Sequence, residues 1–306
     1  MEWNEQDGIR AVRHMKTRAS CRSFQDRPIP EELLRDILEA GLRAASGGNL
    51  QPFSMVVVKD PNTRRQLYEI LGQKFVQEAA VDIFFILDFY KMRIYAEHAR
   101  APYTCNESYF HFMIALQDIM CTAQTMESAA HLCSLGSCYV GTCLIRARQL
   151  ITLLNLPEMT SPVLMLAMGY PRTQPRCSDR LPFESMVFEE RYREMPVQEI
   201  VDAYDEKYAG RNYSLPTKEP YRTQTLEKFK RALGTTYAED EVEEIIGEVA
   251  RDGILHVMQR QFGLHYHALD LPCWGQEAVQ VMDSQKLDPF YRASSASQDS
   301  PSGKGE

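Results

Sequence analysis

The residues best suited to binding chemistry lie in the segment RASCRSFQ, residues 18–25. If residues 18–22 are extended, successive side chains alternate between two faces, so Arg18, Ser20 and Arg22 point the same way. Two guanidinium groups and a hydroxyl on one face suit a phosphate dianion, because charge-assisted, bidentate hydrogen bonds are the strongest kind. The alternative is a solvated basic strand paired with surface acids, and the segment alone leaves both open.

A second candidate site lies in ASGGNLQPF, residues 45–53, where a predicted helix gives way to a strand. Gly47 and Gly48 allow the backbone to approach a flat ring closely, with free N–H groups facing it. Asn49 carries both a donor and an acceptor, which suits the edge of a heteroaromatic ring. The alternative is a glycine helix stop followed by a surface asparagine.

Alternating helices and strands are predicted to position these two segments. Short apolar runs predict buried strands at residues 53–58, 81–88 and 161–171. Apolar stripes, with proline or acidic residues at several of the starts, predict helices at residues 28–45, 61–73, 108–132, 144–156, 225–233 and 239–264. The segment 134–141 is expected to interrupt the helical pattern. The expected class is α+β, a sheet with helices on its faces.

The composition restricts the kinds of partner. The chain has 306 residues and a net charge of -8, which argues against nucleic acid or an anionic membrane as the partner. Its longest apolar run, VDIFFILDF, is too short to span a bilayer, and its polar N-terminus does not resemble a secretory signal. Neither a Rossmann GxGxxG nor a P-loop motif is present. We expect a cytoplasmic protein with a small-molecule partner.

No metal site is expected. The eight cysteines lack the close pairs of zinc sites, so we expect reduced, mostly buried thiols. Cys138 is expected to be a small core residue rather than a nucleophile. The C-terminal residues His256, His265, His267 and Cys273 lack a helical i,i+4 pair of histidines and an acid that would complete a ligand set.

Taken in order, the two candidate segments resemble the start of the FMN-dependent nitroreductase family. Members open with Arg/His-x-Ser-x-Arg, continue with a helix, and then carry a Pro/Ala-Ser-x-x-Asn-x-Gln-Pro segment. The resemblance continues through LGSCYVGTCLIRARQLITLLNLP, PVLMLAMGYP and DRLPFESMVFEERY, and covers about residues 10–211. It is strongest with the branch of larger NAD(P)H-dependent nitroreductases and flavin reductases.

The resemblance implies FMN as the cofactor and assigns residues to it. Arg18, Ser20 and Arg22 match the residues that hold the FMN phosphate. Arg180 matches a second phosphate-binding arginine, and Ser178 stands where the branch commonly has lysine. The residues implied to lie against the flavin ring are Ser46, Gly47, Asn49, Tyr139, Val140, Gly141 and Thr142. Arg211 matches an arginine that binds the 2′-phosphate of NADPH, with a plain surface arginine as the alternative.

The activity implied by the resemblance is ping-pong oxidoreduction with NADPH or NADH as co-substrate and no catalytic protein side chain. A hydride passes from NAD(P)H to flavin N5 and then to a nitroaromatic, a quinone or free flavin. One alternative is a flavin-dependent reductive dehalogenase, for whose long lid residues 61–83 leave little room. The other is a non-catalytic FMN-binding protein. The sequence does not indicate the physiological acceptor.

The family fold implied is a mixed sheet flanked by helices, in an intertwined homodimer with each FMN at the subunit interface. The apolar helix at residues 108–132 fits such an interface. We expect an FMN-binding domain at residues 1–211, a helical extension at 212–292 that packs on the dimer and narrows the flavin entrance, and a disordered tail at 293–306. A separate helical domain on a linker is the alternative for the extension.

Overall fold

A computed structural model describes residues 4–290, which form two compact units. The first unit contains residues 4–177 and 278–290, and the second contains residues 178–277. The tail expected at residues 293–306 lies outside the described residues.

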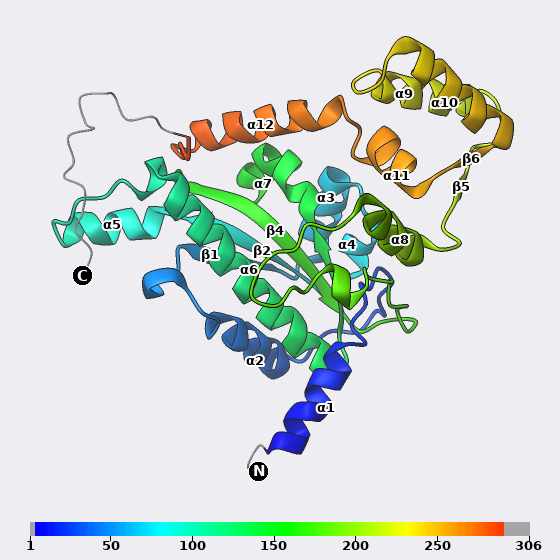
Figure 1. The fold of residues 1–306 in the computed structure, drawn as a ribbon. Helices are drawn as coiled ribbons and strands as arrows, with labels where there is room; N and C mark the ends of the chain where they lie inside the picture. The colour runs from blue at the N-terminus through cyan, green and yellow to red at the C-terminus, as the bar shows by residue number, and fades with distance from the viewer. Residues whose placement is uncertain (1–3, 291–306) are drawn as a thin grey trace. The chain divides into compact units, whose positions relative to one another are not determined.

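The first unit is built on a four-stranded sheet with the strand order β1-β2-β4-β3 (Figure 1). The strands, which pair in antiparallel ladders, are β1 (Phe53–Val58), β2 (Val81–Asp88), β3 (Gly136–Val140) and β4 (Thr160–Gly169). All eight residues of β2 are buried, because this strand lies between two others and is covered on both faces. A parallel bridge between Ser20 and Ser137 places the N-terminal segment beside β3.

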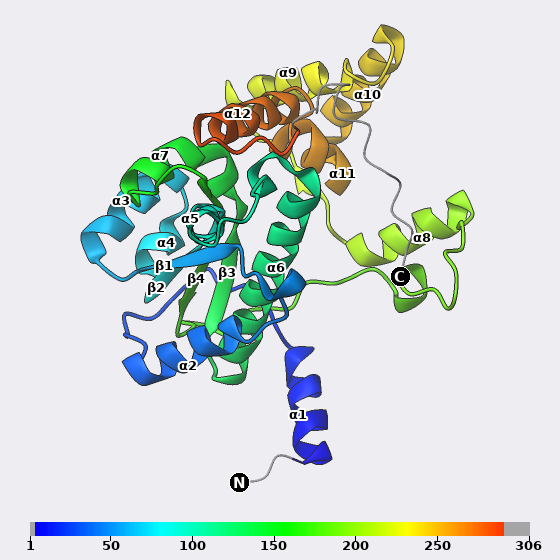
Figure 2. The ribbon, with the colours of Figure 1, turned by 90° about the vertical axis from the view of Figure 1, so that its left-hand side faces the viewer.

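Helices cover both faces of the sheet (Figure 2). One face packs on α2 (Glu31–Leu42) and α6 (Tyr109–Leu132), and the other packs on α3 (Pro61–Leu71), α4 (Lys74–Glu78) and α7 (Ala147–Leu153). Along β2, Phe85 and Leu87 belong to the first core and Phe84 and Ile86 to the second, as the alternation of side chains requires. The expected fold class, a sheet flanked by helices, is confirmed.

The central helix α6 lies close against α2. An added Cβ at Gly41 of α2 would lie 2.3 Å from Cγ of Met126 of α6, so only glycine allows this approach. The expected helices at the positions of α2, α3 and α6, and the strands β1, β2 and β4, are confirmed. Residues 144–156 form a helix only from Ala147, because a 3-10 turn, η3 (Gly141–Arg146), precedes α7.

Several elements of the first unit were not expected from the sequence. The segment 134–141 contains strand β3 and does not merely interrupt a helix. The helices α1 (Glu5–Met15), α4 and α5 (Tyr90–His98) were also missed. Asn4 caps α1 by accepting hydrogen bonds from the backbone N–H groups of Gln6 and Asp7, so the basic run begins on a helix.

The second unit is mostly helical, with its own small core around Phe229, Val242 and Val249. Its elements are α8 (Val197–Tyr208), β5 (Tyr213–Ser214), α9 (Tyr221–Leu233), α10 (Glu239–Asp252), β6 (Ile254–Leu255), α11 (Val257–Arg260) and η5 (Gln261–His265). The single helix expected at 239–264 is wrong: α10 ends at Gly253, whose φ of 67° is left-handed. The last helix, α12 (Asp270–Ser284), runs from the second unit into the first.

The cysteines differ in part from the expectation. All eight are free thiols, but only Cys21, Cys138 and Cys143 are buried, so the expectation of mostly buried thiols is wrong. Burial raises the pKa of Cys143 to about 12. Within residues 4–290, no helix has the length and apolar character that crossing a bilayer requires.

Candidate functional site

The segment with the two arginines runs along the edge of the sheet. The backbone N–H of Cys21 donates to the carbonyl oxygen of Ser137 on β3 at 2.8 Å. Cys21 is buried, whereas Ser20 and Arg22 are exposed, so these side chains alternate about the edge. A hydroxyl and a guanidinium group therefore face outward next to the end of β3.

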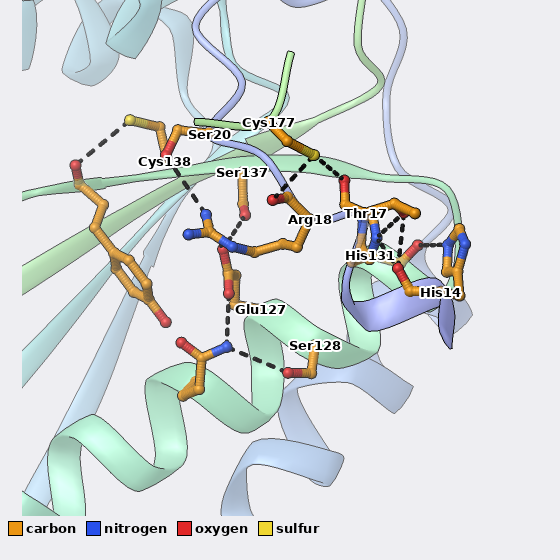
Figure 3. A network of polar contacts seen from close by, with 12 residues as sticks. His14, Thr17, Arg18, Ser20, Glu127, Ser128, His131, Ser137, Cys138 and Cys177 are labelled. Carbon is orange, nitrogen blue, oxygen red and sulfur yellow. Dashed lines mark hydrogen bonds and ion pairs between the residues drawn. The ribbon is translucent and has the colours of Figure 1, made fainter. Parts of the chain in front are cut away.

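Arg18 forms an ion pair with a buried carboxylate (Figure 3). Its Nη1 lies 2.9 Å from Oε1 of Glu127, which projects from α6 and is 1% exposed. The same nitrogen lies 3.5 Å from the hydroxyl oxygen of Ser20. Arg18 therefore bridges a buried acid and the exposed hydroxyl.

Arg22, in contrast, keeps its charge available. Among residues 4–290 it makes no ion pair and no side-chain hydrogen bond, and it is exposed. Burial raises the pKa of the neighbouring Cys21 and Cys138 thiols, an effect that Arg22 partly opposes. These thiols are protonated at neutral pH, which fits Cys138 as a core residue.

The start of this segment is fixed by two stacked histidines. The rings of His14, at the end of α1, and His131, at the end of α6, lie 4.4 Å apart at an angle of 9° (Figure 3). Each Nε2 also lies within 3.2 Å of the other residue's carbonyl oxygen. The stack holds the chain against α6 at His14, six residues before Ser20.

The glycine segment is held by a second acid of α6. The Ser46 hydroxyl donates to Oδ2 of Asp118 at 2.7 Å, and the Gly47 N–H donates to Oδ1 at 2.9 Å. The backbone N–H of Gln51 donates in turn to the Ser46 hydroxyl oxygen at 2.8 Å. One buried carboxylate therefore fixes the whole turn.

The backbone of this turn is left-handed at three positions. Gly48, Asn49 and Gln51 have φ values of 57°, 55° and 48°. Residues other than glycine rarely adopt this backbone conformation, so Asn49 and Gln51 are strained. The hydrogen bonds to Asp118 offset this strain. The result is a rigid turn, η1 (Gly47–Asn49), with the Asn49 side chain exposed.

The third expected segment, Tyr139 to Thr142, covers the last two residues of β3 and the first two of η3. Gln73, the residue before α4, donates from Nε2 to the Thr142 hydroxyl at 3.0 Å. Nothing lies within 4 Å of an added Cβ at Gly141, so space is open beside this backbone. Val140 is buried, and the hydroxyl of Tyr139 is buried without a hydrogen-bond partner. Burial raises the pKa of this phenol, and the nearby Glu127 raises it further.

Arg180 and Arg211 lie in the second unit. Nη1 of Arg180 donates to the carbonyl oxygens of Ser178 and Asp179, and Nη2 of Arg211 pairs with the Asp179 carboxylate. The structure therefore brings these two arginines together around Asp179. The other ten expected site residues belong to the first unit.

Sequence reasoning missed three polar residues that hold the site: Gln73, Asp118 and Glu127. The sequence could have indicated Asp118 and Glu127, because each is an acid within a mostly apolar helix, where buried charged residues are rare unless they have a partner. Their partners could not be read from the sequence, since Ser46 lies 72 residues before Asp118.

The family follows from comparison with known proteins. The model of the nitroreductase family matches residues 15–170, just over half of the chain. The chain belongs to the nitroreductase family. The match spans all ten of the expected site residues that belong to the first unit, and the resemblance seen in the sequence is confirmed.

Individual relatives agree with this family. An NADPH-dependent oxidoreductase of Staphylococcus epidermidis is 29% identical over 213 residues, which are 67% of this chain and 85% of the relative. The solved NADPH:FMN oxidoreductase of Vibrio harveyi is 30% identical, with a TM-score of 0.59 over 64% of this chain and 83% of its own. A proposed oxidoreductase from Bacteroides fragilis is 25% identical, with a TM-score of 0.70 over 90% of this chain and 99% of its own.

Proposed function

We propose that this nitroreductase-family enzyme uses FMN to carry reducing equivalents from NAD(P)H to a small acceptor, by a ping-pong mechanism. Family membership makes it an NAD(P)H-dependent oxidoreductase with FMN as its flavin. The acceptors we propose are nitroaromatics, quinones and free flavin. We also propose that the enzyme works in the cytoplasm, where its free thiols stay reduced.

The residues present fit a phosphate-bearing, flat cofactor. The observation that carries the proposal is the exposed guanidinium of Arg22, which has no side-chain partner within residues 4–290 and lies beside Ser20 and Arg18 on one edge of the sheet. A phosphate dianion would receive charge-assisted hydrogen bonds from this set. Open space beside Gly141 leaves room for a ring next to the same edge.

FMN, when bound, supplies a ring that accepts a hydride and gives it up again. The protein side chains bind and orient this ring. We propose that the turn at Ser46, Gly47 and Asn49 contacts it, and that the rigid hydrogen bonds to Asp118 keep this turn in place. The residues proposed to line the ring on the other segment are Tyr139, Val140, Gly141 and Thr142, with Gln73 supporting Thr142.

The two arginines of the second unit are proposed to bind phosphate groups as well. Arg180 is assigned to the FMN phosphate and Arg211 to the 2′-phosphate of NADPH. In the structure Arg211 is paired with Asp179, an exposed pair that contributes roughly 0–1 kcal/mol to stability. Such a pair yields readily to a phosphate, which carries more charge.

The enzyme is proposed to be a homodimer. The outer face of α6 forms a groove of about 800 Å³ with Met15 of α1, and its lining is mostly apolar. Met120 and Leu132 are 45% and 42% exposed there, and α1 buries none of its residues. These two helical faces have no partner in the part of the chain that the structure describes, so they suit a second copy of this chain, as obligate dimers bury core-like surfaces.

The phosphate assignment is tested with the variant Arg22→Ala. Loss of one charge-assisted contact, worth roughly 1.5–3 kcal/mol, should weaken FMN binding by about tenfold or more. Riboflavin, which lacks the phosphate, should bind Arg22→Ala and wild type alike in a fluorescence titration of apoprotein. Arg65→Ala, an exposed arginine of α3, is the matched control. Unchanged FMN affinity in Arg22→Ala would refute the assignment.

The catalytic part of the proposal has a separate test. Anaerobic addition of NADPH to the purified yellow protein should bleach the flavin absorbance, and a quinone added afterwards should restore it. A flavin that stays oxidised with both NADPH and NADH would mark a non-catalytic FMN-binding protein.

A further inference from the structure

Glu127 is a buried carboxylate to which the proposed function assigns no part. It projects from α6 toward β3 and the N-terminal segment, and it is 1% exposed (Figure 3). Both of its oxygens are used: Oε1 pairs with Arg18 at 2.9 Å and accepts from the Ser137 hydroxyl at 3.3 Å. Oε2 accepts from Nε2 of Gln124 at 2.7 Å.

The position of this acid is unusual for a site that binds an anion. Arg18, Ser20 and Arg22 are proposed to bind a phosphate dianion, yet one of the two arginines is already paired with a carboxylate. The net charge that the three side chains and Glu127 present is +1, from two arginines and one acid. A phosphate that contacts Arg18 must then share the guanidinium with Glu127, and the two anions repel each other.

We propose that Glu127 competes with the FMN phosphate for Arg18 and thereby keeps the flavin exchangeable. This inference rests on the proposed function, because it assumes that Arg18 and Arg22 hold the phosphate. Bound FMN then leaves the protein and is replaced from solution, so the site takes free FMN as a reversibly bound ligand. Glu127 acts through Arg18 and is a positioning residue.

The opposite role for Glu127 is purely structural. In that case the carboxylate only orients Arg18 toward the phosphate, and removing it would weaken FMN binding. The variant Glu127→Gln separates the two roles, because glutamine has the same shape without the charge. Its amide oxygen can still accept from Arg18 and Ser137, and its NH₂ can donate to Gln124 once the Gln124 amide turns over.

The experiment titrates the apoprotein with FMN and with riboflavin, following flavin fluorescence. Glu127→Gln should bind FMN about tenfold or more tightly than wild type and release it correspondingly more slowly, with riboflavin affinity unchanged. Glu127→Asp, which keeps the charge, should show no such gain. Equal or weaker FMN binding by Glu127→Gln, or an equal change for riboflavin, overturns the inference.

Two further measurements keep the test decisive. If Glu127→Gln fails to fold, the wild-type protein loaded with radiolabelled FMN is mixed with excess unlabelled FMN. Exchange within minutes supports the inference, and retention of the label for hours overturns it. Arg22→Ala distinguishes a failure of the proposed phosphate site from a failure of the role of Glu127. If Arg22→Ala binds FMN like wild type, the phosphate site itself is wrong. If Arg22→Ala binds FMN more weakly but Glu127→Gln binds it no more tightly, only the role of Glu127 is refuted.

Discussion

Asp118 holds Ser46 and Gly47 with one carboxylate, through hydrogen bonds of 2.7 and 2.9 Å. Glu127, nine residues further along α6, pairs with Arg18. At 100° per residue, nine residues place the two acids about half a turn apart around the helix, so each holds a different segment. The central helix therefore supports both the ring-binding turn and the phosphate-binding edge.

This arrangement predicts that Asp118 acts on the ring rather than on the phosphate. Asp118→Ala removes two hydrogen bonds to a charged group, each worth roughly 1.5–3 kcal/mol, and releases a strained turn. FMN and riboflavin should then both bind about tenfold or more weakly, as measured by fluorescence titration. Ser46→Ala should show a smaller loss, because Gly47 keeps its bond to Asp118. A loss confined to FMN would contradict this role.

Elements with an apolar pattern in their own sequence were predicted, whereas features that depend on contacts between distant residues were not. β1, β2, β4, α2 and α6 carry continuous apolar runs or apolar stripes, which local sequence reveals. β3 was missed because its residues GSCYV are small or mixed, and only pairing with β4 makes them a strand. The contacts of Asp118 and Glu127 join distant parts of the chain, so no local pattern contains them.

The burial of Asp82 predicts that the free energy of unfolding depends on pH in an unusual direction. This residue of β2 is 0% exposed, and neither carboxylate oxygen has a hydrogen-bond partner. Burial raises its pKa well above the ordinary value, with only partial opposition from Arg64. The native state therefore keeps a proton that the unfolded chain loses above about pH 3.9, so stability falls as pH rises from there toward the native pKa.

Asp82→Asn should remove this dependence. The difference in unfolding free energy between the variant and wild type should grow by about 1.4 kcal/mol for each pH unit within that window. Urea unfolding at pH 5 and pH 8 measures it, with the variant gaining relative stability at the higher pH. Parallel pH profiles for the two proteins would show that Asp82 is ionised in the native state.

The proposed dimer predicts the effect of a charge in the groove on α6. Met120→Glu would bury an unpaired carboxylate between the subunits, at a cost of roughly 3–5 kcal/mol. Equilibrium sedimentation should show dimer association weakened by about a hundredfold or more. Gln66→Glu, on the exposed side of α3, is the control and should leave association unchanged. A wild-type protein that sediments as a monomer with its flavin bound would refute the dimer.

The role of the C-terminal extension remains a prediction, and the structure sharpens its test. A chain that ends after Leu215 loses more than a helical extension, because residues 278–290 belong to the first unit. Leu287 is 1% exposed in the first core, and the N–H of Met159 donates to the Gln285 carbonyl oxygen at 2.7 Å. Truncation should therefore destabilise the first unit by itself.

Leu287→Ala is the matched control for that loss. It should lower the unfolding free energy by roughly 2–5 kcal/mol, as buried leucines do, while keeping residues 216–277. If the extension narrows the flavin entrance, the truncated protein should reduce bulky quinones faster relative to small ones, and Leu287→Ala should keep the wild-type ratio. The ratio is measured with NADPH saturating. An unchanged ratio in a truncated protein that still binds FMN would show that the extension is not part of the site.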